Sequence, residues 1–289
     1  MEQFFDKASM TDRSYKEVCM GQQFFDQRGM PDRCKSWAEL YHLINADMYE
    51  AGDKDLYLEF AHRADGPVLE IAVGTGRVAT YLADRGIEVV GIDTSDHMLE
   101  VCRQNIAELC LGVQGRIIIE KADMRDFNLG RKFKLAIIPF SAFQALLCQK
   151  DQNKTLQCIR KHLKKRGVLV IDVFDPRYDL CSLSNGFVPK VFPPMIHPTT
   201  GRTWNICISS RKNMPERQVF QEEWVFTELD EGGSEASRQV DVLEMRWASR
   251  FEMELLLRRN GFDVLALWGD YEKNPCGYGN RQVWVLRKH

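Results

Sequence analysis

Two glycines stand between an apolar segment and a stretch with helical spacing, in the run Glu70-Ile-Ala-Val-Gly-Thr-Gly76. Glycine allows a tight turn and a close approach of the backbone to a ligand, because it carries no side chain. The helix expected next directs free N–H groups and the positive end of its dipole toward the same place. In open parallel sheets, ligands bind beyond the carboxyl ends of the strands. The run therefore predicts a ligand site at this turn.

Two classes of ligand compete for the turn. Residues Gly74 to Ala79 satisfy the dinucleotide pattern G-x-G-x-x-[GA], and Asp93 stands near the acidic position of that pattern. An NAD(P)-dependent oxidoreductase is therefore one hypothesis. Glu70 argues against it, since a carboxylate at the tip of the strand repels a pyrophosphate and attracts a cationic ligand with an amino group.

The same residues resemble the first motif of the class I S-adenosylmethionine-dependent methyltransferases, [DE]-x-G-x-G-x-G. Glu70, Ala72, Gly74 and Gly76 are in register with it, and Ala72 replaces the first glycine. The resemblance implies that S-adenosylmethionine is the cofactor and that Glu70 and the glycine loop hold its methionine part. It also implies that Asp93 binds both ribose hydroxyls, a role that suits a carboxylate with two acceptor oxygens.

Three further segments match the family at the ends of predicted strands. The resemblance implies that Met98 packs on the adenine, that Asp123 and Met124 meet the adenine edge, and that residues 139–144 line the reaction face. It spans about residues 40–175, with 249–289 supplying the last elements of the family fold. The implied cofactor-binding set is Tyr41, Glu70, Ala72, Gly74, Gly76, Asp93, Thr94, Met98, Asp123, Met124 and Pro139.

Structural explanations compete with several of these roles. Asp123 also suits the cap of a turn ending at Asp126, and Met98 suits a helix core. Arg77 is expected to cover the sheet edge with its stem. The basic run 160–166 is expected to be a solvated helix end rather than a nucleic-acid contact. Asp172 and Asp175 form half of a metal site without a third carboxylate nearby, so we expect no metal.

The elements that position the turn alternate in type. Short apolar runs predict strands at 68–73, 88–92, 116–120, 134–139 and 167–174, and helical spacing predicts helices at 77–85, 95–110, 142–147 and 151–165. After Pro176, three alternating segments without intervening helices predict antiparallel strands at 202–211, 217–229 and 238–248. A helix at 249–259 and strands at 262–270 and 281–287 follow.

This order predicts an α/β fold: a seven-stranded, mostly parallel, doubly wound sheet with an antiparallel last strand, plus an antiparallel β insertion. The expected domains are an N-terminal arm (1–36), a cofactor-binding Rossmann-like core (37–176), an insertion that acts as a substrate lid (177–247), and a C-terminal helix and strand pair that completes the core (248–289).

The acceptor side is less defined. Family members often cover the acceptor with segments in the position of the insertion. A protein or RNA acceptor would more often bring extra basic surface, which the composition does not show, so we expect a small-molecule acceptor, with N-methylation slightly favoured over O- or C-methylation. No catalytic base is identified, and a non-catalytic S-adenosylmethionine-binding scaffold subunit stays open as an alternative. The expected acceptor-binding residues are Tyr49, Phe140, Phe143, Gln144, Trp204, Trp224 and Arg246.

Composition limits the remaining classes. The 289 residues carry 39 Lys and Arg against 41 Asp and Glu, and such a balance argues against general nucleic-acid binding. Nine scattered cysteines without metal-ligand spacing indicate a reduced, cytoplasmic chain. No stretch approaches the roughly 20 apolar residues that cross a bilayer, so we expect no membrane partner. A homodimer is left open.

Overall fold

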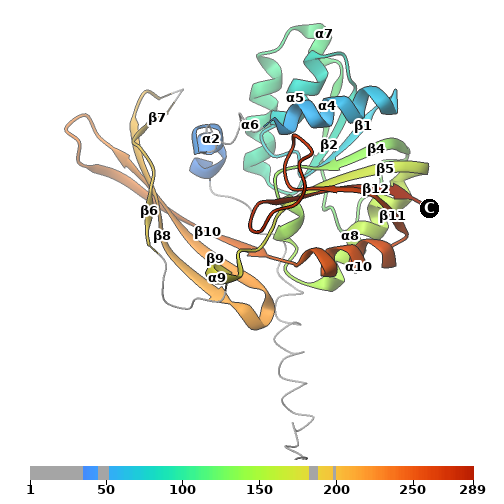
Figure 1. Ribbon diagram of the computed structural model, residues 1–289. Helices are drawn as coiled ribbons and strands as arrows, with labels where there is room; N and C mark the ends of the chain where they lie inside the picture. Colours follow the sequence, from blue (N-terminus) through green and yellow to red (C-terminus); the bar gives the residue numbers. More distant parts are fainter. Residues whose placement is uncertain (1–34, 45–51, 182–187, 198–199) are drawn as a thin grey trace, which may run out of the picture. The chain divides into compact units, whose positions relative to one another are not determined.

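Two sheets of different construction organise the part of the chain that the structure describes, residues 35–44, 52–181, 188–197 and 200–289 of a computed structural model (Figure 1). These residues belong to one compact unit, Asp32–His289. The larger sheet has seven strands in the order β11-β12-β5-β4-β1-β2-β3. Its strands are β1 (Val68–Ile71), β2 (Val89–Asp93), β3 (Ile117–Lys121), β4 (Phe133–Ile138), β5 (Leu163–Phe174), β11 (Phe262–Trp268) and β12 (Arg281–Lys288).

The pairing in this sheet confirms the predicted fold class. Strands β1 to β5 pair in parallel, and β12 is antiparallel to both of its neighbours, β5 and β11. The chain proceeds from β1 through β2 to β3 on one side and then returns to place β4 on the other side of β1. The carboxyl ends of β1 and β4 therefore flank the switch in strand order where ligands bind in such sheets.

Helices cover both faces of the sheet, with α4 and α5 on one face and α8 and α10 on the other (Figure 1). All four residues of β1 are buried, as expected for a parallel strand covered on both sides. Ser95 and Ser249 cap the helices α6 and α10 by accepting bonds from backbone N–H groups three residues later. The helices are α2 (Lys35–Ile44), α4 (Asp53–Ala64), α5 (Arg77–Asp84), α6 (Asp96–Ala107), α7 (Leu111–Gln114), α8 (Gln149–His162), α9 (Tyr178–Cys181) and α10 (Arg250–Arg259).

The second sheet is antiparallel and lies in the predicted insertion. Its strands follow the order β10-β9-β8-β6, and β7 pairs with β8. One face of this sheet carries Trp204, Ile206, Trp224 and Phe226, which form an apolar cluster with Trp37 of α2. The strands are β6 (Lys190–Val191), β7 (Met195–Ile196), β8 (Thr203–Met214), β9 (Val219–Leu229) and β10 (Glu235–Arg246). The domain boundaries at 36/37, 176/177 and 247/248 stay predictions.

Two local expectations need correction. The segment predicted as a helix at 142–147 is a short 3-10 helix, η1 (Ala142–Ala145). The basic run 160–166 is not helical to its end, because α8 ends at His162 and Leu163 already pairs with Phe133 of β4. The pairing then shifts register before Val168, and Arg166 takes a positive φ of 59° in this irregular stretch. A bulge, rather than a helix end, thus carries Lys164 to Arg166.

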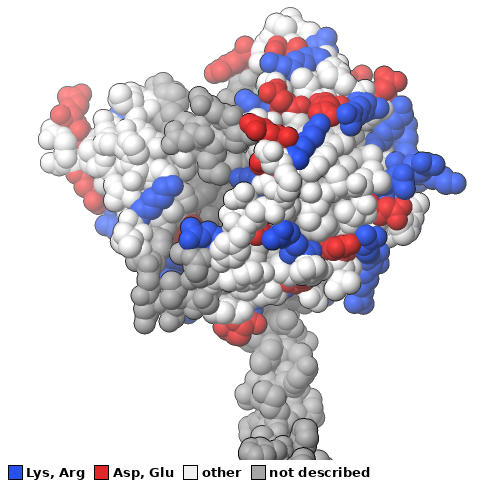
Figure 2. Space-filling view, in the orientation of Figure 1, with Lys and Arg blue, Asp and Glu red and all other residues white. Residues whose placement is uncertain are grey.

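Charged side chains of both signs are spread over the surface. On the face seen in Figure 2, acidic and basic groups alternate over the upper part of the core, and Lys and Arg gather toward the edge near the C-terminus. Across the described ranges, no helix has the length and apolar character needed to span a membrane.

Candidate functional site

The glycine turn leaves β1 in a left-handed conformation. Ala72 has a φ of 56°, and Gly74 and Gly76 have φ values of 56° and 83°. Such angles cost little for glycine but strain a residue with a side chain. Ala72, the position at which the chain departs from the family motif, is therefore a strained residue in a turn that favours glycine.

Replacing Ala72 with glycine is expected to stabilise the protein by about 0.5–1 kcal/mol, because the relief of left-handed strain exceeds the added freedom of the unfolded chain. Urea denaturation of the ligand-free protein measures the change. Ala64→Gly, at the last residue of α4, is the matched control and is expected to destabilise by roughly 0.5–1 kcal/mol. A loss of stability in Ala72→Gly equal to that of the control contradicts the assignment of strain.

The turn is open toward the place where a ligand would lie. A Cβ built on Gly74 meets no atom within 4 Å, whereas one built on Gly76 comes within 2.7 Å of the Cys102 sulfur. Asn105 of α6 donates a hydrogen bond to the Thr75 carbonyl at 2.9 Å. The back of the turn is thus packed against α6, and its front is free for close approach to a cofactor.

Asp93, at the end of β2, is tied to this turn. One carboxylate oxygen accepts a hydrogen bond from the Gly74 N–H and the other accepts one from the Ser95 N–H, both at 2.9 Å. A carboxylate offers about four lone-pair positions, which is more than these two bonds use. Thr94 follows directly and is half-buried. The sequence and structure therefore bring Asp93 and the glycine loop together.

Glu70 is a buried acid with unmet bonding capacity. The residue belongs to β1 and is 2% exposed, and its Oε2 atom has no hydrogen-bond partner among the residues that the structure describes. Burial raises the pKa of Glu70 to about 8; Arg77 opposes this rise, and the charges of Asp53 and Asp93 add to it. A buried carboxyl with a free oxygen fits a cationic group, so the residues at this turn fit a cofactor that carries an ammonium or sulfonium charge.

Arg77 does not merely cover the sheet edge, as expected from the sequence. Its guanidinium makes a two-pronged ion pair with Asp53 of α4, one contact at 2.8 Å, and Asp53 is 1% exposed. The guanidinium also lies 5.4 Å from the centre of the Phe140 ring. Bidentate pairing fixes the arginine plane. Arg77 is thereby held between the glycine turn and the end of β4.

On the predicted adenine side, the Asp123 carboxylate already has hydrogen-bond partners within the protein. The Asp123 carboxylate accepts bonds from the backbone and side chain of Arg125, the shortest at 2.6 Å, and Arg125 also pairs with Asp151 at 2.8 Å. Burial works to raise the pKa of Asp123, but its bonds with Arg125 lower it overall. Met124 is 5% exposed. The turn Asp123–Asp126 is thus closed on itself, which matches the structural explanation for Asp123.

Met98 lies among apolar side chains rather than at an open surface. It is buried in the cluster that holds Trp37, Trp204 and Trp224. These contacts match the core explanation, and its packing on an adenine stays a prediction.

The segment after β4 presents one aromatic side chain. Phe140 follows Pro139 and is half-buried, and its ring centre lies 6.4 Å from that of Tyr41 with the two rings in an edge-to-face arrangement. The Arg281 guanidinium of β12 lies 5.7 Å from the same ring. The structure therefore brings Tyr41, Phe140 and Arg77 together at the carboxyl edge of β4, beside the glycine turn.

Two other residues of this segment are turned into the protein. Phe143 is fully buried, and Gln144 is 2% exposed. The Gln144 side-chain oxygen accepts a hydrogen bond from the Phe174 N–H at 2.9 Å, which ties η1 to the end of β5. The contacts they make here are structural, and contact with an acceptor stays a prediction for both.

The insertion residues named from the sequence are also engaged within the protein. Trp204 and Trp224 are 5% and 8% exposed and belong to the cluster with Trp37. Arg246 bonds to the side chains of Gln218 and Glu252 at 2.6 and 2.5 Å. Tyr49 lies outside the described residues. The acceptor-binding roles of all four stay predictions.

Two buried ion pairs could not be found from the sequence. Asp53 pairs with Arg77 over 24 positions, and Asp172 pairs with Arg281 over 109 positions at 2.9 Å. From the sequence, Asp172 stands out only beside Asp175, as half of a metal site. Within the described residues, no group of three His, Cys, Asp or Glu side chains is arranged to hold a metal ion. The sequence marks only one of these four paired residues: Arg77 stands at the first position of a helix that follows a glycine turn.

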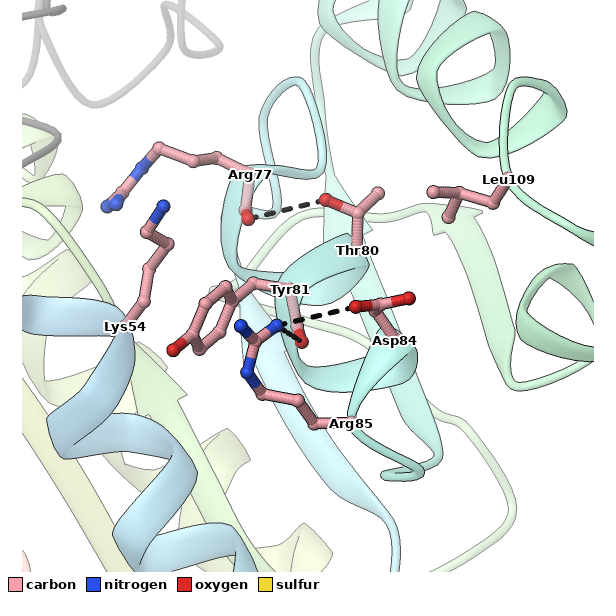
Figure 3. Close-up of a pocket in the computed structure, with 7 residues that line it drawn as sticks. All are labelled: Lys54, Arg77, Thr80, Tyr81, Asp84, Arg85 and Leu109. Carbon is pink, nitrogen blue, oxygen red and sulfur yellow. Dashed lines mark hydrogen bonds and ion pairs between the residues drawn. The ribbon is translucent and has the colours of Figure 1, made fainter.

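A hollow of about 490 Å³ lies between α4 and α5, and Arg77 is the residue that it shares with this arrangement (Figure 3). Its lining side chains interact with their own neighbours: the Arg85 guanidinium lies 3.6 Å from the Asp84 carboxylate, and the Thr80 hydroxyl donates a hydrogen bond to the Gly76 carbonyl. Of the predicted site residues that the structure describes, none lines it. The lining residues are Lys54, Arg77, Thr80, Tyr81, Asp84, Arg85 and Leu109.

Comparison with known proteins gives concordant results. Residues 68–167 match a family model described as a methyltransferase domain. The candidate methyltransferase YqeM of Bacillus subtilis (strain 168) is 29% identical over 234 residues, which are 80% of this chain and 88% of that protein. A dTDP-3-amino-3,6-dideoxy-alpha-D-glucopyranose N,N-dimethyltransferase of Streptomyces fradiae is 30% identical over 144 residues, 47% of this chain and 52% of that protein.

Solved structures agree on the fold. The chain is similar to a S-adenosylmethionine-dependent methyltransferase from Clostridium acetobutylicum ATCC 824, with a TM-score of 0.70 and 18% identity, over 86% of this chain and 96% of that one. The oxidoreductase and scaffold alternatives gain no support from these findings. Together with the glycine turn, the buried Glu70 and the strand order already described, they show that residues 68–167 match a methyltransferase domain and that the chain has the fold of a S-adenosylmethionine-dependent methyltransferase.

Proposed function

We propose that this enzyme transfers a methyl group from S-adenosylmethionine to an amino group of a small molecule. When bound, the cofactor supplies a methyl group on a positively charged sulfur, and the leaving group is a neutral thioether. The observation that carries the proposal is the buried Glu70 with its unpartnered oxygen, next to a backbone turn open at Gly74. Glu70 would hold the cationic methionine part, and Asp93 would accept hydrogen bonds from the ribose hydroxyls.

The adenine would lie beyond Asp93, on the side of β3. Thr94 and Met124 are near in sequence to the ends of the two strands, β2 and β3, that pair at Asp93 and Lys121. Asp123 would meet the adenine edge through the oxygen capacity that its bonds with Arg125 leave. Met98, buried in its apolar cluster, would support the adenine from behind.

The reaction face would be the group of Tyr41, Phe140 and Arg77. Two carboxylates that contact this group or its backbone are engaged by cations: Asp53 by Arg77 and Asp172 by Arg281. We therefore propose neither of them as a catalytic base. An amine needs no base if it reaches the site uncharged, whereas a hydroxyl acceptor would want one. Alignment of the nucleophile with the methyl carbon in a dry site would then supply most of the rate enhancement.

The insertion supports a small acceptor. Phe220 of β9 lies 5.7 Å from Phe174, ring centre to ring centre, so the insertion sheet reaches the carboxyl end of β5. The Streptomyces fradiae relative is named for an amino sugar linked to dTDP, which favours an amine acceptor of similar size. A small-molecule acceptor, rather than a nucleic acid, also fits the formal net charge of −2. Cytoplasmic location stays a prediction, and a homodimer stays open.

Isotopically labelled methyl transfer tests the acceptor class. A dTDP-linked 3-amino-dideoxyhexose is expected to be methylated with a kcat/KM at least about 100-fold above that of the same sugar with a hydroxyl in place of the amine. The rate with the amine should rise with pH until the amine is fully uncharged. Equal methylation of the hydroxyl sugar would contradict N-methylation. Tight cofactor binding without transfer to any amine in a metabolite extract would favour the scaffold alternative.

A further inference from the structure

A fully buried carboxylate lies directly behind the reaction face. Asp172 lies in β5, two residues before the strand ends at Phe174, and it is 0% exposed. The donors come from α4, the segment after β4, the loop after β11, and β12. Its Oδ2 accepts hydrogen bonds from Tyr57 Oη at 2.6 Å, Phe140 N at 2.7 Å and Tyr271 Oη at 3.1 Å, and its Oδ1 accepts bonds from Arg281 Nη1 at 2.9 Å and Ser141 N at 3.0 Å.

The two backbone donors are in an unusual conformation. Phe140 and Ser141 have φ values of 54° and 62°, so two successive non-glycine residues are left-handed. This conformation is unfavourable for residues with a Cβ. Successive N–H groups in such a turn can converge on one anion. Here the anion is the Asp172 side chain, which belongs to the protein itself and compensates the strain with two charge-assisted hydrogen bonds.

The strained pair determines where the Phe140 ring lies. The ring is held near Tyr41, and its centre lies 5.4 and 5.7 Å from the guanidinium groups of Arg77 and Arg281. If Phe140 relaxed to a negative φ, its side chain would leave the backbone in another direction and these contacts would be lost. The position of this aromatic ring thus depends on a carboxylate 32 residues later in the chain.

We propose that Asp172 is a positioning residue for methyl transfer, which holds Phe140 and Ser141 left-handed so that the Phe140 ring stays at the reaction face. Asp172 touches neither cofactor nor acceptor in this assignment. The inference rests on the proposed function, because it assumes that the ring borders the transferring methyl group. It adds a residue outside the family motifs to the machinery of the site.

A purely structural role for Asp172 makes different predictions. In that case its loss would lower stability and cofactor binding together, as the loss of any buried hydrogen-bonded carboxylate does. A positioning role lowers kcat in protein that is still folded and still binds cofactor. Asp175 supplies a matched control, since it is 5% exposed and accepts bonds from Gly279 N at 3.0 Å and Gln282 Nε2 at 2.9 Å, away from the turn after β4.

The experiment compares Asp172→Asn with Asp175→Asn. An asparagine replaces one acceptor oxygen with an N–H₂ group, which cannot accept the hydrogen bonds that this oxygen accepted. Asp172→Asn is therefore expected to lower kcat about 30-fold or more, while the dissociation constant of S-adenosylhomocysteine changes less than about threefold. Asp175→Asn is expected to keep kcat within about threefold despite a similar loss of stability. Adding Ser141→Gly to Asp172→Asn should restore kcat about tenfold, because glycine takes the left-handed conformation freely.

A second variant covers the case in which Asp172→Asn does not fold. Ser141→Val leaves Asp172 intact but disfavours the left-handed turn, and it should lower kcat with cofactor affinity preserved. Hydrogen exchange at the amides of residues 140 and 141 should be slow in the wild type and fast in Asp172→Asn. This measurement needs no acceptor, so it separates failure of the proposal from failure of the proposed function. Unchanged exchange, unchanged kcat, or a kcat loss that glycine does not rescue would each overturn the positioning role.

Discussion

Glu70→Gln is expected to weaken S-adenosylmethionine binding roughly 10- to 100-fold, because it removes the carboxylate that would pair with the cationic methionine part of the cofactor. The glutamine has nearly the same shape, so the packing of β1 should be preserved. Isothermal titration calorimetry measures the change. Glu88→Gln, at an exposed position just before β2, is the matched control and should bind the cofactor as the wild type does.

The pH dependence of binding makes this prediction sharper. With a pKa of about 8 in the ligand-free protein, Glu70 is mostly protonated at neutral pH. A cationic ligand favours the ionised form, so binding should release close to one proton at about pH 7, and affinity should rise with pH until about pH 8. Calorimetry in buffers of different ionisation enthalpy reports the proton. Glu70→Gln should abolish the release and flatten the pH dependence; persistence of both would assign them to another group.

The same substitution should stabilise the ligand-free protein. The folded pKa of Glu70 is raised above its ordinary value of 4.5, so the folded state binds the proton more tightly than the unfolded chain does. The contribution of this group to the free energy of unfolding is complete at pH values below that ordinary pKa. It falls as pH rises toward about 8, by about 1.4 kcal/mol per pH unit at most. Glutamine carries no such cost. Urea denaturation at about pH 8 should therefore show Glu70→Gln to be more stable than the wild type.

The elements that position the site were predictable because their signals are local. Strand runs such as 68–73 and 88–92 are continuous and apolar, since parallel strands are buried on both faces, and the structure has strands at both places. The turn between them also follows from local chemistry, since Gly74 and Gly76 both have positive φ. Helix and strand periods, glycine turns and strand order are all encoded within a few neighbouring residues.

The contacts behind the reaction face were not predictable, because each depends on residues far apart in the chain. Nothing near Phe140 indicates that its backbone is left-handed, since Asp172 stabilises that conformation from another strand. Arg77 was expected only to cover the sheet edge with its stem, because its partner Asp53 lies in another helix. Alternation in the insertion likewise predicted strands, but it could not indicate that Trp224 would pack on Trp37.

Asp93→Ala is expected to weaken cofactor binding at least about 100-fold, because Asp93 serves two partners at once. In the ligand-free protein its carboxylate holds the Gly74 N–H and the Ser95 N–H, and in the complex it would also accept the ribose hydroxyls. Alanine therefore removes the proposed ribose contact and frees the glycine turn that shapes the rest of the site. Asp84→Ala, at an exposed position at the end of α5, should leave affinity unchanged.

A thermodynamic cycle with 2′-deoxy-S-adenosylhomocysteine separates the two contributions of Asp93. In the wild type, removal of the 2′-hydroxyl should cost about tenfold or more in affinity, because it leaves a charged acceptor without its donor. In Asp93→Ala the same removal should cost little, since the acceptor is already gone, and the loss that remains measures the loosened turn. If the hydroxyl matters equally in both proteins, the ribose does not lie against Asp93. Since the turn also borders Glu70, misplacement of the ribose would shift the methionine part as well, and the orientation of the cofactor toward Phe140 would have to be redrawn.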